Sequence, residues 1–184
     1  MDVMETIKNR RSIRKYRSDP IPDDVLQTLL EAVRWAPSWA NTQCWEIILI
    51  KDPQTKSDLT AAFPKGNPAL SAIVDAPLVM VLCGKKGLSG YYKGQAATSK
   101  GDWLMFDTGI AMQNLCLAAH SQGLGTVVVG LFDQKKVGEI LGVPPEVEVV
   151  AMTPVGYPAA EGGSPKRKEV SQFVFHEKYG KEKE

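Results

Sequence analysis

Two arginines, Arg10 and Arg14, lie four positions apart in the stretch RRSIR, with Arg11 and Ser12 between them. On a helix, positions i and i+4 are neighbours, so two cations there repel each other unless an anion lies between them. The planar guanidinium group suits a phosphate, because it donates paired hydrogen bonds. The stretch therefore predicts either a phosphate site or an ordinary solvated basic surface. A nucleic-acid-binding arm is disfavoured, because no aromatic or disordered sequence accompanies the cluster.

A second basic cluster, SPKRK (164–168), contains Lys166 and Arg167. The 22 Lys and Arg residues against 21 Asp and Glu residues leave a net charge of +1, too balanced for a protein that coats nucleic acid. Both basic clusters are therefore local features. This second cluster is either solvated surface or the other half of an anion site.

A third candidate is the stretch PSWANTQCW (37–45), which lies between a predicted helix end and a predicted buried strand. Its amides and hydroxyl could bind the polar edge of a heteroaromatic ring while an indole covers the ring face. The same stretch could also be an ordinary loop with Trp45 in the core. The candidate binding residues here are Pro37, Ser38, Asn41 and Gln43.

Other chemistries lack their motifs. The stretch GLGTVVVG resembles a dinucleotide fingerprint, but its glycines precede the strand and the third glycine position is Val128. No GxxxxGK[ST] or GxSxG motif occurs, and three cysteines without CxxC spacing argue against a zinc site or a disulfide framework. Gly130 ends this strand-like run, where it either turns the chain or lets a backbone N–H approach a ligand closely.

The elements that must position these residues follow from apolar periodicity. Apolar residues recur at helical spacing between Val25 and Val33, after Pro22 and two aspartates that suit a helix start. Further helices are expected at 53–63, 69–76 and 133–141, and strands at 45–51, 77–83, 124–130 and 147–156. This alternation predicts one α/β or α+β domain over residues 1–184.

Three further segments have a distinct character. Residues 84–101 are rich in Gly, Lys and Tyr and are expected to form a lid-like loop. The sequence of residues 102–122 predicts a helix that is apolar on most sides. A second subunit is expected to bury part of its apolar surface. The 157–184 extension contains a strand-like piece, 170–176, which could pair with a sheet edge of its own chain or of a partner.

Taken in order, RRSIRKY, APSWANTQCW, DWLMFDTGIAMQNLCLAAHSQGLGTVVVG and VGYP…PKRK resemble the flavin-dependent nitroreductase family. The resemblance spans Arg10 to Tyr179. It implies an α+β fold with a mixed β-sheet flanked by helices, and a homodimer with FMN at the subunit interface. It also implies that the C-terminal strand is exchanged with the partner subunit.

The resemblance further implies roles for individual residues. The FMN phosphate and ribityl chain would be held by Arg10, Arg11, Ser12 and Arg14, completed by Lys166 and Arg167, with Asn67 as a further ribityl contact. The ring would meet Pro37, Ser38, Asn41 and Gln43, partly from the other subunit. Val129 and Gly130 would face the reactive N5 atom.

The implied function is hydride transfer from NADH or NADPH, through flavin N5, to a nitroaromatic, quinone or related acceptor in a ping-pong cycle. No side chain is expected to act as a catalytic acid or base, and no metal is expected. Two alternatives remain: an FMN carrier or ferredoxin-fed redox module, and a relative specialised in flavin cleavage, dehalogenation or alkene reduction. Without an apolar leader or membrane segment, a cytoplasmic location is expected.

The chain departs from the family pattern at three places. Cys44 replaces the proline of the common NxQPW motif, and Val129 stands where some members carry an acid before the N5-facing glycine. The chain is also short, so the cover over the flavin must come mainly from residues 84–101.

Overall fold

The computed structural model describes residues 2–181. In chain order its elements are α1 (Val3–Asn9), α2 (Asp23–Arg34), η1 (Trp39–Asn41), β1 (Trp45–Ile50), α3 (Pro53–Leu59), η2 (Thr60–Ala62), α4 (Leu70–Asp75), β2 (Leu78–Lys85), β3 (Tyr91–Tyr92), β4 (Gln95–Ala96), α5 (Leu104–Ser121), β5 (Gly125–Thr126), α6 (Gln134–Leu141), β6 (Val147–Gly156) and η3 (Val170–Gln172). Within this range, no helix has both the length and the apolar character needed to cross a bilayer.

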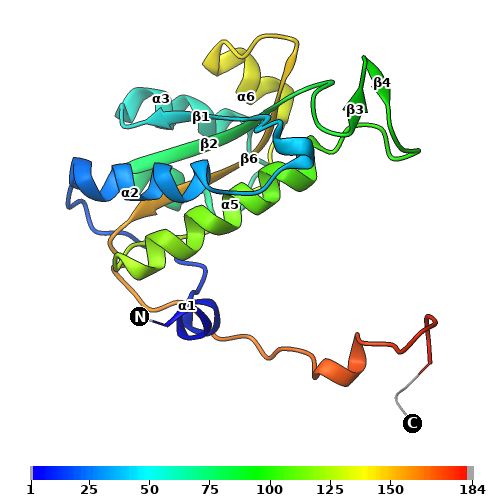
Figure 1. Ribbon diagram of the computed structural model, residues 1–184. Coiled ribbons are helices and arrows are strands. Elements are labelled where there is room, and N and C mark those ends of the chain that lie inside the picture. The colour runs from blue at the N-terminus through cyan, green and yellow to red at the C-terminus, as the bar shows by residue number, and fades with distance from the viewer. Residues whose placement is uncertain (1, 182–184) are drawn as a thin grey trace.

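The larger sheet has the strand order β1-β2-β6-β5, and helices cover both of its faces (Figure 1). Alternate residues of β2 point to opposite faces of the sheet. Leu78, Met80 and Leu82 join the core under α2 and α5, whereas Val79, Val81 and Cys83 join the core under α3, α4 and α6. This double burial explains why the sequence of β2 is a continuous apolar run.

The expected mixed sheet differs from the observed one in strand direction. All neighbouring strands in the order β1-β2-β6-β5 pair antiparallel, and the one parallel pairing in the described chain is an isolated bridge from Ser12 to Thr126. The reason is visible at the end of β1, where Ile50 pairs with Val79 at the start of β2. The helical connection therefore leaves and re-enters the sheet at the same end, which makes the two strands antiparallel.

The predicted strand at 124–130 is shorter than expected. Only Gly125 and Thr126 form β5, and Val129 rejoins the ladder through a single bridge to Met152. Between them the pairing breaks, and Val128 is 52% exposed. An edge strand needs partners only on one side, so the apolar run alone could not show where pairing would stop.

The predicted strand at 170–176 is wrong for the single chain. Val170–Gln172 is a 3-10 turn, and the Phe173 and Val174 N–H groups both bond back to the Val170 carbonyl. A strand needs a partner edge, and none of this segment's described backbone bonds reaches the sheet. Residues 164–181, here called the arm, instead extend away from the main body (Figure 1). The last three residues of the predicted extension lie outside the described range.

The lid-like segment contains the short hairpin β3–β4, which projects beside the N-terminal end of α5 (Figure 1). Trp103 anchors its base, because its indole Nε1–H donates to Thr98 Oγ1 at 3.1 Å and its backbone N–H donates to the Ser89 carbonyl at 3.0 Å. Its role as a lid stays a prediction.

The three cysteines are buried and free. Burial raises the pKa of Cys44 and of Cys83 to about 11, and burial also raises the pKa of Cys116. At pH 8 the thiols are therefore neutral as well as inaccessible, and only the thiolate is strongly nucleophilic.

We expect Ellman's reagent at pH 8 to label none of the three cysteines in the folded protein and all three after unfolding in urea. Rapid labelling of the folded chain would contradict the packing described.

Candidate functional site

The RRSIR stretch follows α1 as extended chain rather than as helix. Ser12 forms the parallel bridge to Thr126, and the Ile13 N–H donates to the Thr126 carbonyl at 2.9 Å. In extended backbone, alternate side chains share a side. Ile13 is buried against the sheet, so Ser12 and Arg14 lie on the opposite side, where Arg14 is exposed. The even spacing of Arg10 and Arg14 thus puts them on the same side of an extended chain, about 13 Å apart along it, and the helical interpretation was wrong.

Arg10 and Arg11 line a cavity of about 610 Å³ at the C-terminal end of α5. Burial lowers the pKa of His120, which also lines this cavity, and the charges of Arg10 and Arg11 lower it further. Within residues 2–181, neither Arg10 nor Arg14 forms an ion pair. The Nε2 atom of His120 is buried without a hydrogen-bond partner. Glu161 also lines the cavity but forms no ion pair within the described residues, so the basic side chains outnumber the acidic one at this end, which favours an anionic ligand.

From Thr126 the chain continues along the sheet edge to Val129 and Gly130. Two hydrogen bonds between the backbones of Val129 and Met152, of 2.8 and 3.0 Å, fix this segment. Gly130 is exposed, a Cβ there would meet open space, and its N–H donates to no other described residue. Asn67 lies beside it, because its side-chain amide donates to the Leu131 carbonyl at 2.9 Å. The structure thus offers a free backbone donor on an accessible edge.

The residues 37–43, here called the 37–43 loop, hold an unusual backbone conformation. Ala40, Asn41 and Gln43 have φ angles of 43°, 56° and 48°, in the left-handed region that residues with a Cβ rarely adopt. The loop borders a cavity of about 380 Å³ that Trp35 also lines. The side-chain amides of Asn41 and Gln43 contact each other, because Gln43 Nε2 donates a hydrogen bond to Asn41 Oδ1 at 3.2 Å. Both side chains are exposed and available to a ligand.

Asp107, which contacts this loop, was not among the site residues predicted from the sequence. Asp107, on the first turn of α5, is 1% exposed and accepts a hydrogen bond from the Trp39 N–H. The available signal was a lone acid inside an otherwise apolar helix. A buried carboxylate is costly unless it is hydrogen-bonded, so its position indicates a specific partner.

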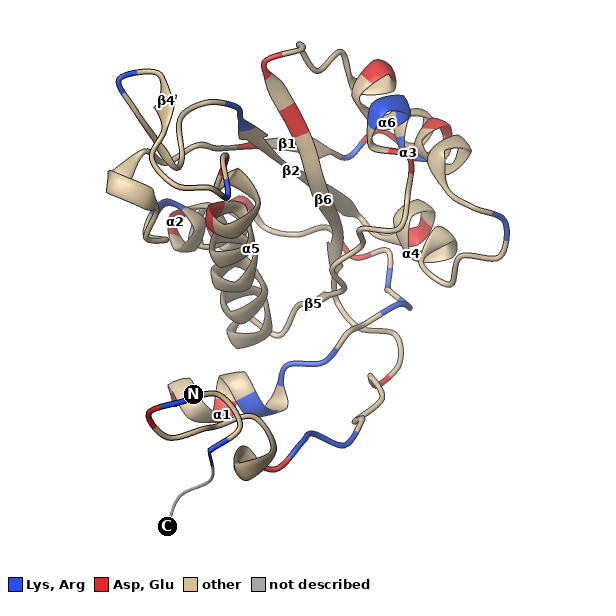
Figure 2. Cartoon of the chain, turned by 90° about the vertical axis from the view of Figure 1, so that its right-hand side faces the viewer, with Lys and Arg blue, Asp and Glu red and all other residues tan. Residues whose placement is uncertain are grey.

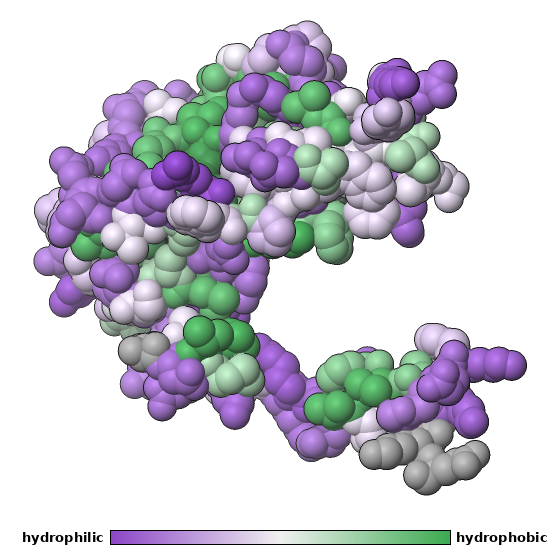
Figure 3. Space-filling view, viewed as in Figure 1, coloured by the Kyte–Doolittle hydropathy of each residue, from purple (hydrophilic) through white to green (hydrophobic). Residues whose placement is uncertain are grey.

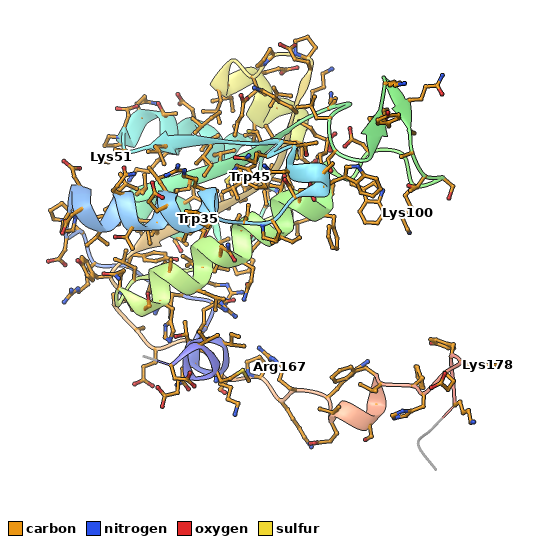
Figure 4. All side chains as sticks on the ribbon, viewed as in Figure 1. Trp35, Trp45, Lys51, Lys100, Arg167 and Lys178 are labelled. Carbon is orange, nitrogen blue, oxygen red and sulfur yellow. The ribbon has the colours of Figure 1, made fainter. Side chains whose placement is uncertain are left out.

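Two groups of the predicted site residues lie at opposite ends of α5. The 37–43 loop contacts Asp107, while Arg10 and Arg11 line a cavity together with His120. His120 follows Asp107 by thirteen positions on α5, a rise of about 20 Å at 1.5 Å per residue. Figure 4 shows Trp35 on the main body and Arg167 on the arm, apart from each other. One chain therefore does not bring both groups to one ligand.

The C-terminal basic residues are only partly joined to the first group. Arg11 Nη2 donates to Ser164 Oγ at 3.1 Å, which brings the start of the arm to the RRSIR stretch. Arg167 bonds within the arm, donating to the Pro165 carbonyl at 2.9 Å, and Lys166 is exposed. Figure 2 shows Lys and Arg along both the N-terminal segment and the arm.

Comparison with known proteins settles the family. The model of the nitroreductase family matches residues 7–73 and 64–157, which together are most of the chain. The chain belongs to the nitroreductase family. The α+β nitroreductase fold expected from the sequence is thereby confirmed. The exchange of the C-terminal strand remains a prediction.

Individual nitroreductase-family relatives agree. An NADH dehydrogenase of Thermus thermophilus is 31% identical over 188 residues, covering 88% of this chain and 89% of that protein. A nitroreductase family protein of Clostridium novyi NT has a TM-score of 0.77 and 31% identity, covering 99% of this chain and 97% of that one. An FMN-dependent nitroreductase of Clostridium difficile has a TM-score of 0.80 and 25% identity, covering 96% and 100%.

Proposed function

We propose that this protein is an FMN-dependent oxidoreductase that transfers a hydride from NADH or NADPH to a nitroaromatic, quinone or related acceptor. The observation that carries the proposal is that Arg10 and Arg14, which form no ion pair within the described residues, lie on the same sheet edge as the free Gly130 N–H. Membership of the nitroreductase family supports the choice of FMN as the anionic ligand, because a close structural relative is an FMN-dependent nitroreductase.

The residues present fit FMN. Arg10 and Arg14 would hold the phosphate, completed by Arg167 and Lys166 of the arm, and Arg11, Ser12 and Asn67 would hold the ribityl chain. The Gly130 N–H and the Val129 backbone would face the ring at N5. The ring would also meet the 37–43 loop residues, which are Pro37, Ser38, Asn41 and Gln43.

When bound, FMN supplies the two-electron chemistry that links a reduced nicotinamide to an acceptor, in two half-reactions at one site. The chain's own residues bind and orient. Arginines at the phosphate and backbone N–H groups at the ring stabilise negative charge, which lowers the cost of the reduced state. No side chain needs to move a proton, consistent with the absence of any acid–base pair among the residues assigned to the site.

We infer a homodimer because a single chain separates the two groups. Two copies could bring the loop of one protomer to the arginines of its partner. The arm exposes Val170 at 66%, Phe173 at 58% and Tyr179 at 94%, and α1 exposes Val3 at 68%. Figure 3 shows apolar surface on both. Exposed apolar surface of this extent is typical of an interface, and residues 170–176 could become a strand on the partner's sheet edge.

Substitution of Arg10 tests the phosphate assignment. We expect Arg10→Ala to weaken FMN binding by about 1.5–3 kcal/mol through loss of a charge-assisted hydrogen bond. This corresponds to roughly ten- to a hundred-fold in the dissociation constant, measured by quenching of flavin fluorescence. Arg17→Ala is the matched control, because Arg17 already pairs with Asp19 at 3.1 Å. Equal FMN affinity in Arg10→Ala and wild type would remove the phosphate assignment.

Steady-state oxidation of NADH or NADPH with a nitroaromatic acceptor tests the reaction itself. The proposal expects the bound flavin to lose its colour with a reduced nicotinamide and to regain it with the acceptor. A flavin that neither nucleotide reduces would instead indicate an FMN carrier or a ferredoxin-fed module.

A further inference from the structure

The carboxylate of Asp107 joins three segments that are distant in sequence. It accepts the Trp39 N–H at 3.2 and 3.1 Å on its two oxygens, the Ser89 hydroxyl at 2.6 Å and the Cys44 thiol at 3.8 Å. Trp39 lies in the 37–43 loop, Cys44 follows that loop, and Ser89 lies at the base of the lid-like segment. Since no described cation pairs with this buried carboxylate, these donors are its stabilising contacts.

The loop needs such a contact because its backbone is strained. Three of its residues hold left-handed φ angles, a conformation that persists only where surrounding contacts impose it. The bonds from Gln43 N–H to Ser38 Oγ, at 2.9 Å, and from Gln43 to Asn41 stay within the loop. The hydrogen bond that ties the loop to the rest of the fold runs from Trp39 to Asp107. The Trp39 ring adds a contact to Trp103, with ring centroids 5.2 Å apart.

Cys44 strengthens the same attachment. The proline of the common NxQPW motif would restrict the backbone but has no side-chain donor. Cys44 instead directs a thiol at Asp107 Oδ2, and its carbonyl accepts the Lys85 N–H at 2.8 Å. The end of the loop is thereby held by the same carboxylate as its beginning.

We propose that Asp107 is the positioning residue of the 37–43 loop, holding Ser38, Asn41 and Gln43 in the conformation that meets the flavin ring. This inference rests on the proposed function. Because Asp107 is only 1% exposed, it acts through the backbone of Trp39 and not by contact with a ligand. Through Ser89, the same carboxylate also ties the base of the lid-like segment to the loop.

The experiment compares FMN binding in Asp107→Asn, Asp107→Leu and Asp102→Asn with wild type. Asp102 is a matched control, because it accepts the Gly87 N–H at 2.7 Å and the Leu104 N–H at 2.9 Å without contacting the loop. We expect about a tenfold higher FMN dissociation constant in Asp107→Asn, a larger increase in Asp107→Leu, and no change in Asp102→Asn. The fluorescence of bound flavin should also be less quenched in both Asp107 variants, because quenching reports the surroundings of the ring.

Riboflavin, which lacks the phosphate, separates an effect on the ring end of the site from an effect on the phosphate end. Asp107→Asn should weaken riboflavin and FMN by the same factor, whereas Arg10→Ala should weaken FMN alone. Thermal unfolding of each apo variant shows whether it is folded at the titration temperature. If Asp107→Leu does not fold, Asp107→Asn decides.

The outcomes distinguish the two claims. A wild-type protein that does not bind FMN overturns the proposed function and the inference with it. Wild-type binding together with unchanged affinity and quenching in a folded Asp107→Asn overturns the inference alone, even if its melting temperature falls.

Discussion

Removal of residues 164–184 is expected to yield a monomer that does not retain FMN. The deleted segment carries Lys166 and Arg167, which are proposed to complete the phosphate site. It also carries the exposed apolar side chains of the arm, which are proposed to cover the partner. Obligate dimers commonly bury more than about 2,000 Å², and loss of a crossing segment removes much of such an area. Because binding of the cofactor and of the partner are linked, both should fail together.

Sedimentation velocity and flavin absorbance of the truncated protein measure the two losses. Two substitution variants separate their causes. Changing Lys166 and Arg167 to Ala should reduce FMN affinity in a protein that stays dimeric. Changing Phe173 and Phe175 to Ser should dissociate the dimer while leaving the basic residues in place. A truncated chain that sediments as an FMN-loaded dimer would refute the assigned role of the arm.

Substitution of Gly125 by Ala is expected to disrupt the proposed FMN phosphate site in the RRSIR stretch, although it changes no charged residue. A Cβ at Gly125 would lie 2.6, 2.6 and 2.8 Å from the Cβ, Cγ1 and Cγ2 atoms of Ile13. The Ile13 Cβ cannot swing aside, so the RRSIR segment must move away from β5 and weaken its 2.9 Å bond to Thr126. Overpacking of this kind costs about 1–3 kcal/mol of unfolding free energy.

Urea unfolding of the apoprotein and FMN titration both report this change. Affinity for FMN should fall as well, since Arg10, Ser12 and Arg14 move with Ile13. Gly138→Ala is the control, because a Cβ there meets Val143 at an ordinary 3.8 Å. That variant should gain about 0.5–1 kcal/mol from helix propensity. If Gly125→Ala unfolds at the wild-type urea concentration, the close approach of β5 to Ile13 is not as described.

Elements with strong local signals were predictable from the sequence. The helical spacing of apolar residues in α2 is matched by the burial of Leu26, Leu29 and Val33. The apolar run of β2 is a central strand with both faces covered. In these cases the residues that define the element also form its core, so the local pattern and the tertiary packing agree.

Features that depend on distant contacts were not predictable. The RRSIR stretch reads as helical by its charge spacing, but it becomes extended because Thr126 offers it an edge. Asp107 carries no motif of its own, and its importance arises only when the fold brings Trp39 to it. The arm has strand-like composition, yet a strand forms only where a second edge is present, and one chain does not provide that edge.

The separation of the candidate residues along α5 has a consequence for mixed assemblies. If each site takes its arginines from one protomer and its loop from the other, then a chain defective in Arg10 can complement a chain defective in Gln43. In their heterodimer, one site combines both defects and the other combines neither. Co-expression of the two defective chains would then restore one working site in each heterodimer, an outcome that a site contained within one chain does not allow.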